Sequence, residues 1–204
     1  MKRSVRKKQK MKALCIIGSP KTNGSTARLV GRVIEGMESQ NIKVSRYFLD
    51  EMNINYCKGC EKCEINRKCV QMDDMNILID EINESNIIIL ASPSYWGDVT
   101  GQMKTFIDRS LPLCNAKIGE TPVPKGKFGV AVAVRAGNSK EENQHIVDTF
   151  KHYFGHLEIQ PIAALTAEGI RSIDDIEIDQ TKLEEAFNLG RKLKNKLKYF
   201  EQDA

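Results

Sequence analysis

The stretch KALCIIGSPKTNGST, residues 12–26, decides the fold class. Its first half is an apolar run that ends in Gly-Ser, which is typical of a strand buried on both faces of a parallel sheet. Its second half is a hydroxyl-containing loop that leads directly into STARLVGRVIEGMES (25–39), where Leu29, Val33 and Met37 recur at fourfold spacing behind a Ser/Thr N-cap. Strand, loop and helix in this order predict the opening unit of an α/β domain.

The same alternation continues to the end of the chain. The pattern predicts further strands at 44–49, 86–95, 126–134 and 157–165, and further helices at 73–85, 99–111, 139–155 and 180–200. Gly155 should close the fourth of the five helices, and Pro161 indicates that the last strand lies at an edge or carries a bulge. With no internal repeat and no linker, we expect one doubly wound, five-stranded parallel sheet with helices on both faces.

The charge of the chain is concentrated at its start. The 204 residues carry a net charge of +4, but residues 1–10 hold six lysines and arginines and no acid, so the remainder is left with −2. We therefore expect a basic disordered tail at 1–10, one domain at 11–204, and no nucleic-acid partner. No apolar run reaches the roughly 18 residues that cross a bilayer, which favours a cytoplasmic protein without membrane contact.

Ligands of doubly wound sheets bind where the strands end, which directs attention to the loops 18–26, 92–98 and 135–139. In the first of these, hydroxyls and free N–H groups at a helix N-terminus can surround a phosphate. The triphosphate-binding pattern G-x-x-x-x-G-K-[ST] is absent, because Asn23 stands at the second glycine. The loop suits a single terminal phosphate such as that of FMN. The alternative is a simple turn N-capped by Ser25.

The loop after the third strand reads SPSYWGD, residues 92–98. Tyr95 and Trp96 can form a wall for a planar ring at low entropic cost, and Pro93 and Gly97 shape the backbone around it. The alternative is that the two aromatic side chains pack in a subunit interface.

Four of the six cysteines fall within the loop 56–70. Cys57, Cys60, Cys63 and Cys69 form the pattern C-x2-C-x2-C-x5-C. Four thiolates in so compact a run can ligate one iron–sulfur cluster, whereas structural zinc usually uses two separated knuckles. The alternative is a loop of free thiols, or a labile disulfide, beside the ring site.

Three segments together resemble one family. GSPKTNGST (18–26), CKGCEKCEINRKCVQMDDM (57–75) and SPSYWGDVTGQMKTFIDR (92–109) are similar to the NADPH-dependent FMN reductases and the iron–sulfur flavoproteins. The resemblance implies a flavodoxin-like fold with non-covalently bound FMN, NAD(P)H as reductant, and a homodimer or homotetramer. It also implies a [4Fe–4S] cluster on the four cysteines if the chain follows the second group.

The resemblance also assigns roles to residues. The phosphate of FMN would be held by Ser19, Lys21, Asn23, Ser25 and Thr26. The ring would be bordered by Pro93, Ser94, Tyr95, Trp96 and Gly97, and touched by the third loop, Arg135, Ala136, Gly137 and Asn138.

Three functions follow from these assignments. The first is an FMN-dependent oxidoreductase that passes electrons from NAD(P)H to a quinone, a nitro compound or another flavin. The second is an electron carrier whose cluster receives electrons from a ferredoxin-like donor. The third is a thiol-based redox sensor in which the flavin is secondary. We expect no catalytic acid–base residue, because the flavin itself carries out the chemistry.

Overall fold

The computed structural model describes residues 11–114 and 119–200, the last four of these by their backbone alone. The predicted basic tail, residues 1–10, lies outside the described residues. Within them, no helix is both long enough and apolar enough to cross a membrane.

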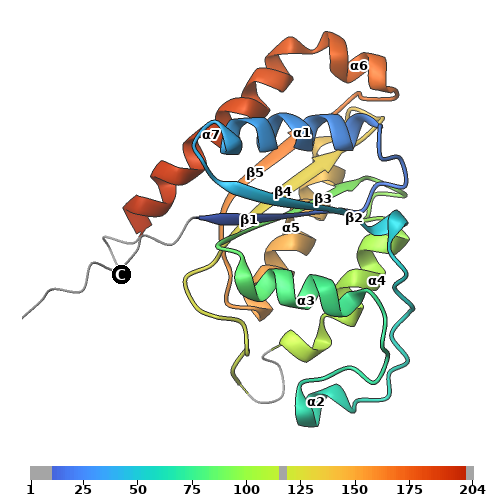
Figure 1. Cartoon of the computed structure of the whole chain (residues 1–204). Coiled ribbons are helices and arrows are strands. Elements are labelled where there is room, and N and C mark those ends of the chain that lie inside the picture. The colour runs from blue at the N-terminus through green and yellow to red at the C-terminus, as the bar shows by residue number, and fades with distance from the viewer. Residues whose placement is uncertain (1–10, 115–118, 201–204) are drawn as a thin grey trace, which may run out of the picture.

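Five parallel strands form one sheet (Figure 1). They are β1 (Lys12–Ile17), β2 (Lys43–Phe48), β3 (Ile87–Pro93), β4 (Phe128–Val134) and β5 (Gln160–Ala167). Their order is β2-β1-β3-β4-β5, which is the flavodoxin-like order with its switch point between β1 and β3. The predicted fold class is confirmed.

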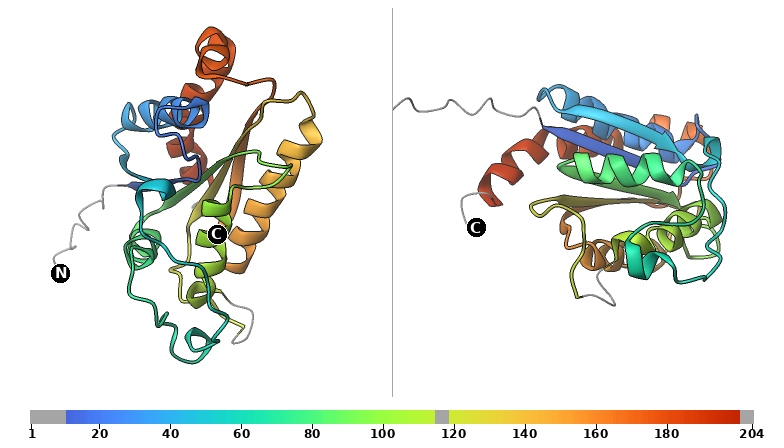
Figure 2. Two further views of the ribbon diagram at one scale, coloured as in Figure 1. Left: turned by 90° about the vertical axis from the view of Figure 1, so that its right-hand side faces the viewer. Right: turned by 60° about the horizontal axis from the view of Figure 1, so that its bottom comes forward.

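Helices cover both faces of the sheet (Figures 1 and 2). On one face lie α1 (Ser25–Glu38), α6 (Ile173–Ile178) and α7 (Gln180–Phe200); on the other lie α3 (Met75–Glu84), α4 (Gly101–Arg109) and α5 (Lys140–His156). The short α2 (Cys63–Asn66) belongs to the cysteine loop and stands away from the sheet. Two 3₁₀ turns, Leu49–Glu51 and Leu111–Leu113, complete the elements.

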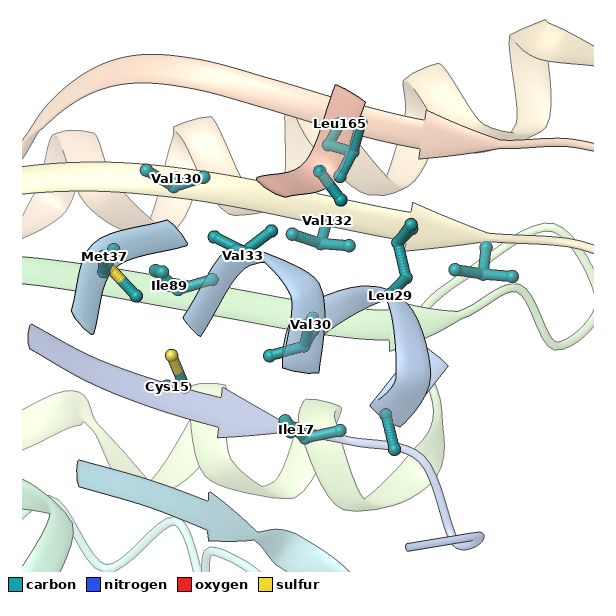
Figure 3. Packing of buried hydrophobic residues seen from close by; sticks show 14 of the residues in the cluster. Cys15, Ile17, Leu29, Val30, Val33, Met37, Ile89, Val130, Val132 and Leu165 are labelled. Atoms are coloured by element: carbon teal, nitrogen blue, oxygen red, sulfur yellow. The ribbon is translucent and has the colours of Figure 1, made fainter. Parts of the chain in front are cut away.

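The two faces of β1 explain why this strand is apolar throughout. Ala13, Cys15 and Ile17 pack toward α1 and α7, whereas Leu14 and Ile16 pack toward α3 and α4. Figure 3 shows the first of these layers, in which α1 inserts its apolar side chains between residues of four strands. Burial of the Cys15 thiol raises its pKa to about 12, so this cysteine is an inert core residue, as its place in the strand predicts.

Two local predictions have different outcomes. Pro161 lies in an edge strand, and the register with β4 shifts beside it, so both of its expected roles are met. Gly155 does not close α5. That helix continues to His156 and is followed by Leu157 and Ile159, both buried, with the left-handed turn displaced to Glu158. Burial of these two apolar side chains outweighs the local preference for a helix to end at glycine.

Helices α1 and α7 meet backbone to backbone. A Cβ atom added to Gly36 would collide with the carbonyl of Phe187, and one added to Gly190 would collide with the carbonyl of Val33. Only glycine permits so close an approach, and the contact holds α7 over α1.

We predict that Gly36→Ala and Gly190→Ala each lower the free energy of unfolding by about 2 kcal/mol or more, because the two helices must separate to admit the methyl group. Gly31→Ala is the matched control in the same helix, since a Cβ there meets nothing within 4 Å. It should be neutral or stabilising by up to about 1 kcal/mol. Denaturant unfolding measures all three, and equal effects at Gly31 and Gly36 would contradict this account.

Candidate functional site

One cavity of about 450 Å³ lies at the carboxyl end of the sheet. Four loops line this cavity. Three of them are the ligand-binding loops that the sequence predicts, and the fourth was not predicted. Its walls are residues of the first loop (Ser19, Lys21, Asn23, Gly24, Ser25, Thr26), of the second (Pro93, Ser94, Tyr95), of the third (Val134, Arg135, Ala136) and of the β5–α6 connection (Ile170, Arg171, Ser172, Ile173). Loops distant in sequence meet here because parallel strands end at one edge.

The first loop presents an uncapped helix N-terminus to this cavity. Gly24 is the N-cap of α1 and has no side chain to bond the first-turn N–H groups, which lack partners within a helix. The Ser19 hydroxyl is buried and accepts from the N–H of Lys21 at 3.1 Å, which holds the loop in a tight turn. This end of the cavity therefore carries donors suited to an anion.

The β5–α6 connection completes the same end. The Ser25 hydroxyl donates to the carbonyl of Ser172 at 2.8 Å, which ties the two loops together. Arg171 follows β5 and adds a second cationic side chain to the one from Lys21. Sequence reasoning missed this wall. The available signal was the Ser172-x-x-Asp175 capping box, which marks where α6 begins.

The second loop is a tight reversal. Tyr95 and Asp98 exchange backbone hydrogen bonds at 2.9 and 3.1 Å, and the two residues between them, Trp96 and Gly97, both have positive φ, 56° and 78°. A non-glycine residue with positive φ is uncommon, so Trp96 is held in a costly conformation at the tip of the turn. Its side chain is fully exposed.

The predicted ring residues therefore divide between two cavities. Tyr95 lines the cavity described above, whereas Trp96, Gly97 and Gly137 line an adjoining one that Ser94, Arg135 and Ala136 share. Asn138 belongs to neither of these two cavities, and its side chain lies against Gly169.

Thr100 joins the first two loops. Its buried hydroxyl donates to the carbonyl of Gly18 at 2.7 Å and accepts from the N–H of Met103, as the N-cap of α4. Its N–H donates to the Ser92 hydroxyl at 3.1 Å. A Cβ on Gly18 would lie 2.8 Å from this same hydroxyl, so glycine is required there.

The cysteine loop turns through three left-handed residues, Gly59, Glu61 and Arg67. All four thiols are free; Cys57 and Cys60 are exposed, Cys69 is half-buried and Cys63 is buried. The pKa of Cys63 is raised by burial and then by the charges of the three other thiols, so the four share one neighbourhood. Within the described part of the chain, no three Cys, His, Asp or Glu side chains are arranged to hold a metal ion.

A buried ion pair closes the base of this loop. Arg109, at the end of α4, bonds both carboxylate oxygens of Asp73 at 2.7 and 2.8 Å and the carbonyl of Asn55 at 2.6 Å. Both charged side chains are at least 97% buried. Asn55 precedes the cysteines and Asp73 follows them, so one guanidinium fixes the two ends of the loop.

A family model for NADPH-dependent FMN reductases matches residues 11–169. The chain belongs to this family. It is an FMN-dependent oxidoreductase by membership, and the resemblance seen in its sequence is confirmed.

Relatives of this FMN reductase family member include two archaeal iron–sulfur flavoproteins. That of Archaeoglobus fulgidus is 42% identical over 132 residues, which are 65% of this chain and 58% of the relative. That of Methanocaldococcus jannaschii is 32% identical over 189 residues, 90% of this chain and 95% of the relative. The solved FMN-dependent NADH-azoreductase of Bacillus anthracis, in complex with FMN, has a TM-score of 0.71 at 14% identity and covers 89% of this chain and 99% of its own. The last likeness shows the shared fold.

The cavity fits the cofactor of the FMN reductase family by its chemistry. Its lining includes an uncapped helix N-terminus, hydroxyls and the cations Lys21 and Arg171, as a phosphate requires, and also Pro93, Tyr95 and Val134, as a ring requires. Its volume lies in the usual range for ligand sites. The four free thiols likewise have the donor chemistry of a cluster site.

We predict that Arg171→Ala weakens FMN binding about fivefold, a loss of about 1 kcal/mol for an exposed charge pair. Fluorescence titration of apoprotein with FMN measures the change, which should shrink at high salt. Arg191→Ala removes an equally exposed arginine from α7, away from the cavity, and should leave the affinity unchanged. Equal affinity of the Arg171 variant and wild type would remove this residue from the site.

We predict a pH dependence from Asp73. Burial alone would raise the pKa of its carboxyl, but hydrogen bonds from Arg109 and from the N–H groups of Asn55 and Met75 outweigh burial and lower the pKa to about 2. The unfolded chain therefore binds this proton more tightly, and the stabilisation present above pH 4 is lost as the pH falls toward 2.

The loss should reach roughly 2 kcal/mol and should disappear in Asp73→Asn. Denaturant unfolding of metal-free apoprotein between pH 5 and 2 measures it. Asp108→Asn, which breaks the surface pair with Lys104 (2.5 Å), is the control and should keep the wild-type slope.

Proposed function

We propose that this protein transfers electrons from NAD(P)H to a small acceptor, such as a quinone, a nitro compound or another flavin, through bound FMN. The observation that carries the proposal is the cavity at the carboxyl end of the sheet, whose lining combines anion-binding groups with apolar and aromatic ones. Family membership supports the choice of FMN over other phosphates.

FMN, when bound, supplies a ring that accepts a hydride and releases electrons. The chain's own residues bind and orient it. In this proposal Ser19, Ser25, Thr26 and the α1 N-terminus hold the phosphate, assisted by Lys21, Asn23 and Arg171. Pro93–Gly97 and Arg135–Asn138 border the ring, and their backbone N–H groups stabilise negative charge on it. Tyr95 covers one wall.

A second candidate is an electron carrier with a [4Fe–4S] cluster on Cys57, Cys60, Cys63 and Cys69, reduced by a ferredoxin-like donor. Four free thiols in one neighbourhood and the names of the two archaeal relatives favour it. Lys58, Lys62 and Lys68 in the same loop would offset part of the negative charge of such a group. The two candidates share one FMN site and differ in the acceptor.

The predicted homodimer or homotetramer stays a prediction. Its support is the fully exposed Trp96, held in a left-handed turn beside the ring residues. A neighbouring subunit would remove this large apolar side chain from water.

We predict one FMN per chain in protein purified without oxygen. About four iron atoms and four acid-labile sulfides per FMN would support the cluster of the second candidate, and none would leave the reductase. NADH and NADPH oxidation, with a quinone as acceptor, then separates the two candidates. Steady turnover supports the reductase, whereas negligible turnover alongside fast reduction by ferredoxin supports the carrier.

Serine substitution of Cys57 and Cys60 together is the matched variant. It should remove the iron and leave the FMN content unchanged, because neither side chain lines the cavity. Protein that neither binds added FMN nor accepts electrons from any reductant contradicts both candidates.

A further inference from the structure

The clamp at the base of the cysteine loop leaves two of the five N–H groups of Arg109 unused, one on Nη2 and one on Nε. The guanidinium carries five N–H bonds, of which Nη1 serves Asn55 and Asp73 and Nη2 serves Asp73. The remaining nitrogen, Nε, is buried and has no hydrogen-bond partner in the described part of the chain. A buried cationic donor without an acceptor is costly, which indicates that an acceptor belongs there.

The neighbouring sulfur is that of Cys69. The Asp73 carboxylate holds the pKa of Arg109 above its ordinary value by hydrogen bonding and by charge, and the charge of the Cys69 sulfur adds to this effect. Cys69 is the half-buried fourth member of the cysteine pattern, four residues before Asp73. The same guanidinium is therefore bonded to the Asp73 carboxylate and near enough to a candidate cluster ligand for the charge of that ligand to act on it.

We propose that Arg109 is a positioning residue of the iron–sulfur site: it donates a hydrogen bond to the Cys69 sulfur and thereby raises the reduction potential of the cluster. The inference rests on the second candidate function, in which Cys69 is a ligand. Hydrogen bonds to ligand sulfurs and local charge are among the main determinants of cluster potential. Reduction adds one negative charge, so a donor at the sulfur stabilises the reduced form more than the oxidised form.

Other cations of the loop are less suited to this role. Lys58, Lys62 and Lys68 are exposed, where solvent and salt screen their charges. Arg67 donates to the backbone carbonyls of Cys114 and Glu120, which anchors the loop to the segment after α4. Asp73 neutralises the net charge of Arg109, so the effect on the cluster comes from the directed N–H bond and its local dipole.

The test is the midpoint potential of the cluster, followed by EPR during anaerobic redox titration of the full-length protein with FMN bound. Arg109→Lys keeps the charge but loses the planar fork that reaches Asp73 and Cys69 together. In this variant we expect the ratio of reduced to oxidised cluster, measured at the wild-type midpoint potential, to fall about tenfold. This corresponds to a midpoint potential lower by about 59 mV for one electron. Arg67→Lys is the matched control: it loosens a loop anchor of the same residue type and should leave the potential unchanged.

FMN content and affinity report whether each variant is folded around the flavin site. If Arg109→Lys does not retain FMN, the double variant Arg109→Met with Asp73→Asn, which removes the donor without leaving an unpaired carboxylate, is measured in its place with the same expected direction.

The outcomes are distinct. A potential that falls in the Arg109 variant and not in the Arg67 variant supports the inference. An unchanged potential in an Arg109 variant that retains its iron overturns the inference and leaves the electron-carrier function intact. An equal fall in both variants also overturns the inference, because it would show a general loosening of the loop. Wild-type protein without iron and sulfide overturns the cluster itself and the inference with it.

Discussion

The hydrogen bond from the Thr100 hydroxyl to the carbonyl of Gly18 organises the carboxyl end of the sheet. Through it the start of α4 is tied to the phosphate loop, and the Thr100 N–H ties the same point to Ser92 at the end of β3. The bonds lie in the buried interior, where an unmade bond is expensive. The two loops that approach the flavin are thus held in a fixed relation, and Gly18 must lack a side chain for the bond to form.

Helix α4 connects this point to the cysteine loop. Thr100 caps its first turn and Arg109 ends its last, so about 13.5 Å of rigid helix separates the flavin loops from the clamp on Asp73. The cysteine loop has little regular structure of its own, and its two ends are held by the ion pair rather than by a strand or a long helix. The placement of the four thiols relative to the cavity therefore depends on this helix, on one residue at each end of it, and on the anchor that Arg67 forms with the segment after α4.

How far sequence reasoning reaches depends on the range of the interaction. The strands and long helices were predictable because apolar periodicity reports burial directly, and the Lys104–Asp108 pair was predictable because i, i+4 neighbours on a helix always meet. Ser25 and Ser172 are 147 residues apart, and Arg109 and Asp73 are 36 apart, so their bonds exist only once the sheet has brought the elements together. The wall at Ile170–Ile173 and the clamp were missed for this reason. Gly155 failed as a helix end because tertiary burial of the following residues outweighed a local rule.

The buried pair of Arg109 and Asp73 is hard to explain by stability alone. Removing two charges from water costs several kcal/mol per ion, and well-packed apolar side chains often replace such a pair without loss. A guanidinium nevertheless provides what an apolar pair cannot: a directed donor that can reach a sulfur while its other nitrogens bond both ends of a loop. The unpaired Nε is the part of this arrangement that loop closure does not require. An arginine at this position is explained if it both closes the loop and, as proposed above, donates a hydrogen bond to the Cys69 sulfur.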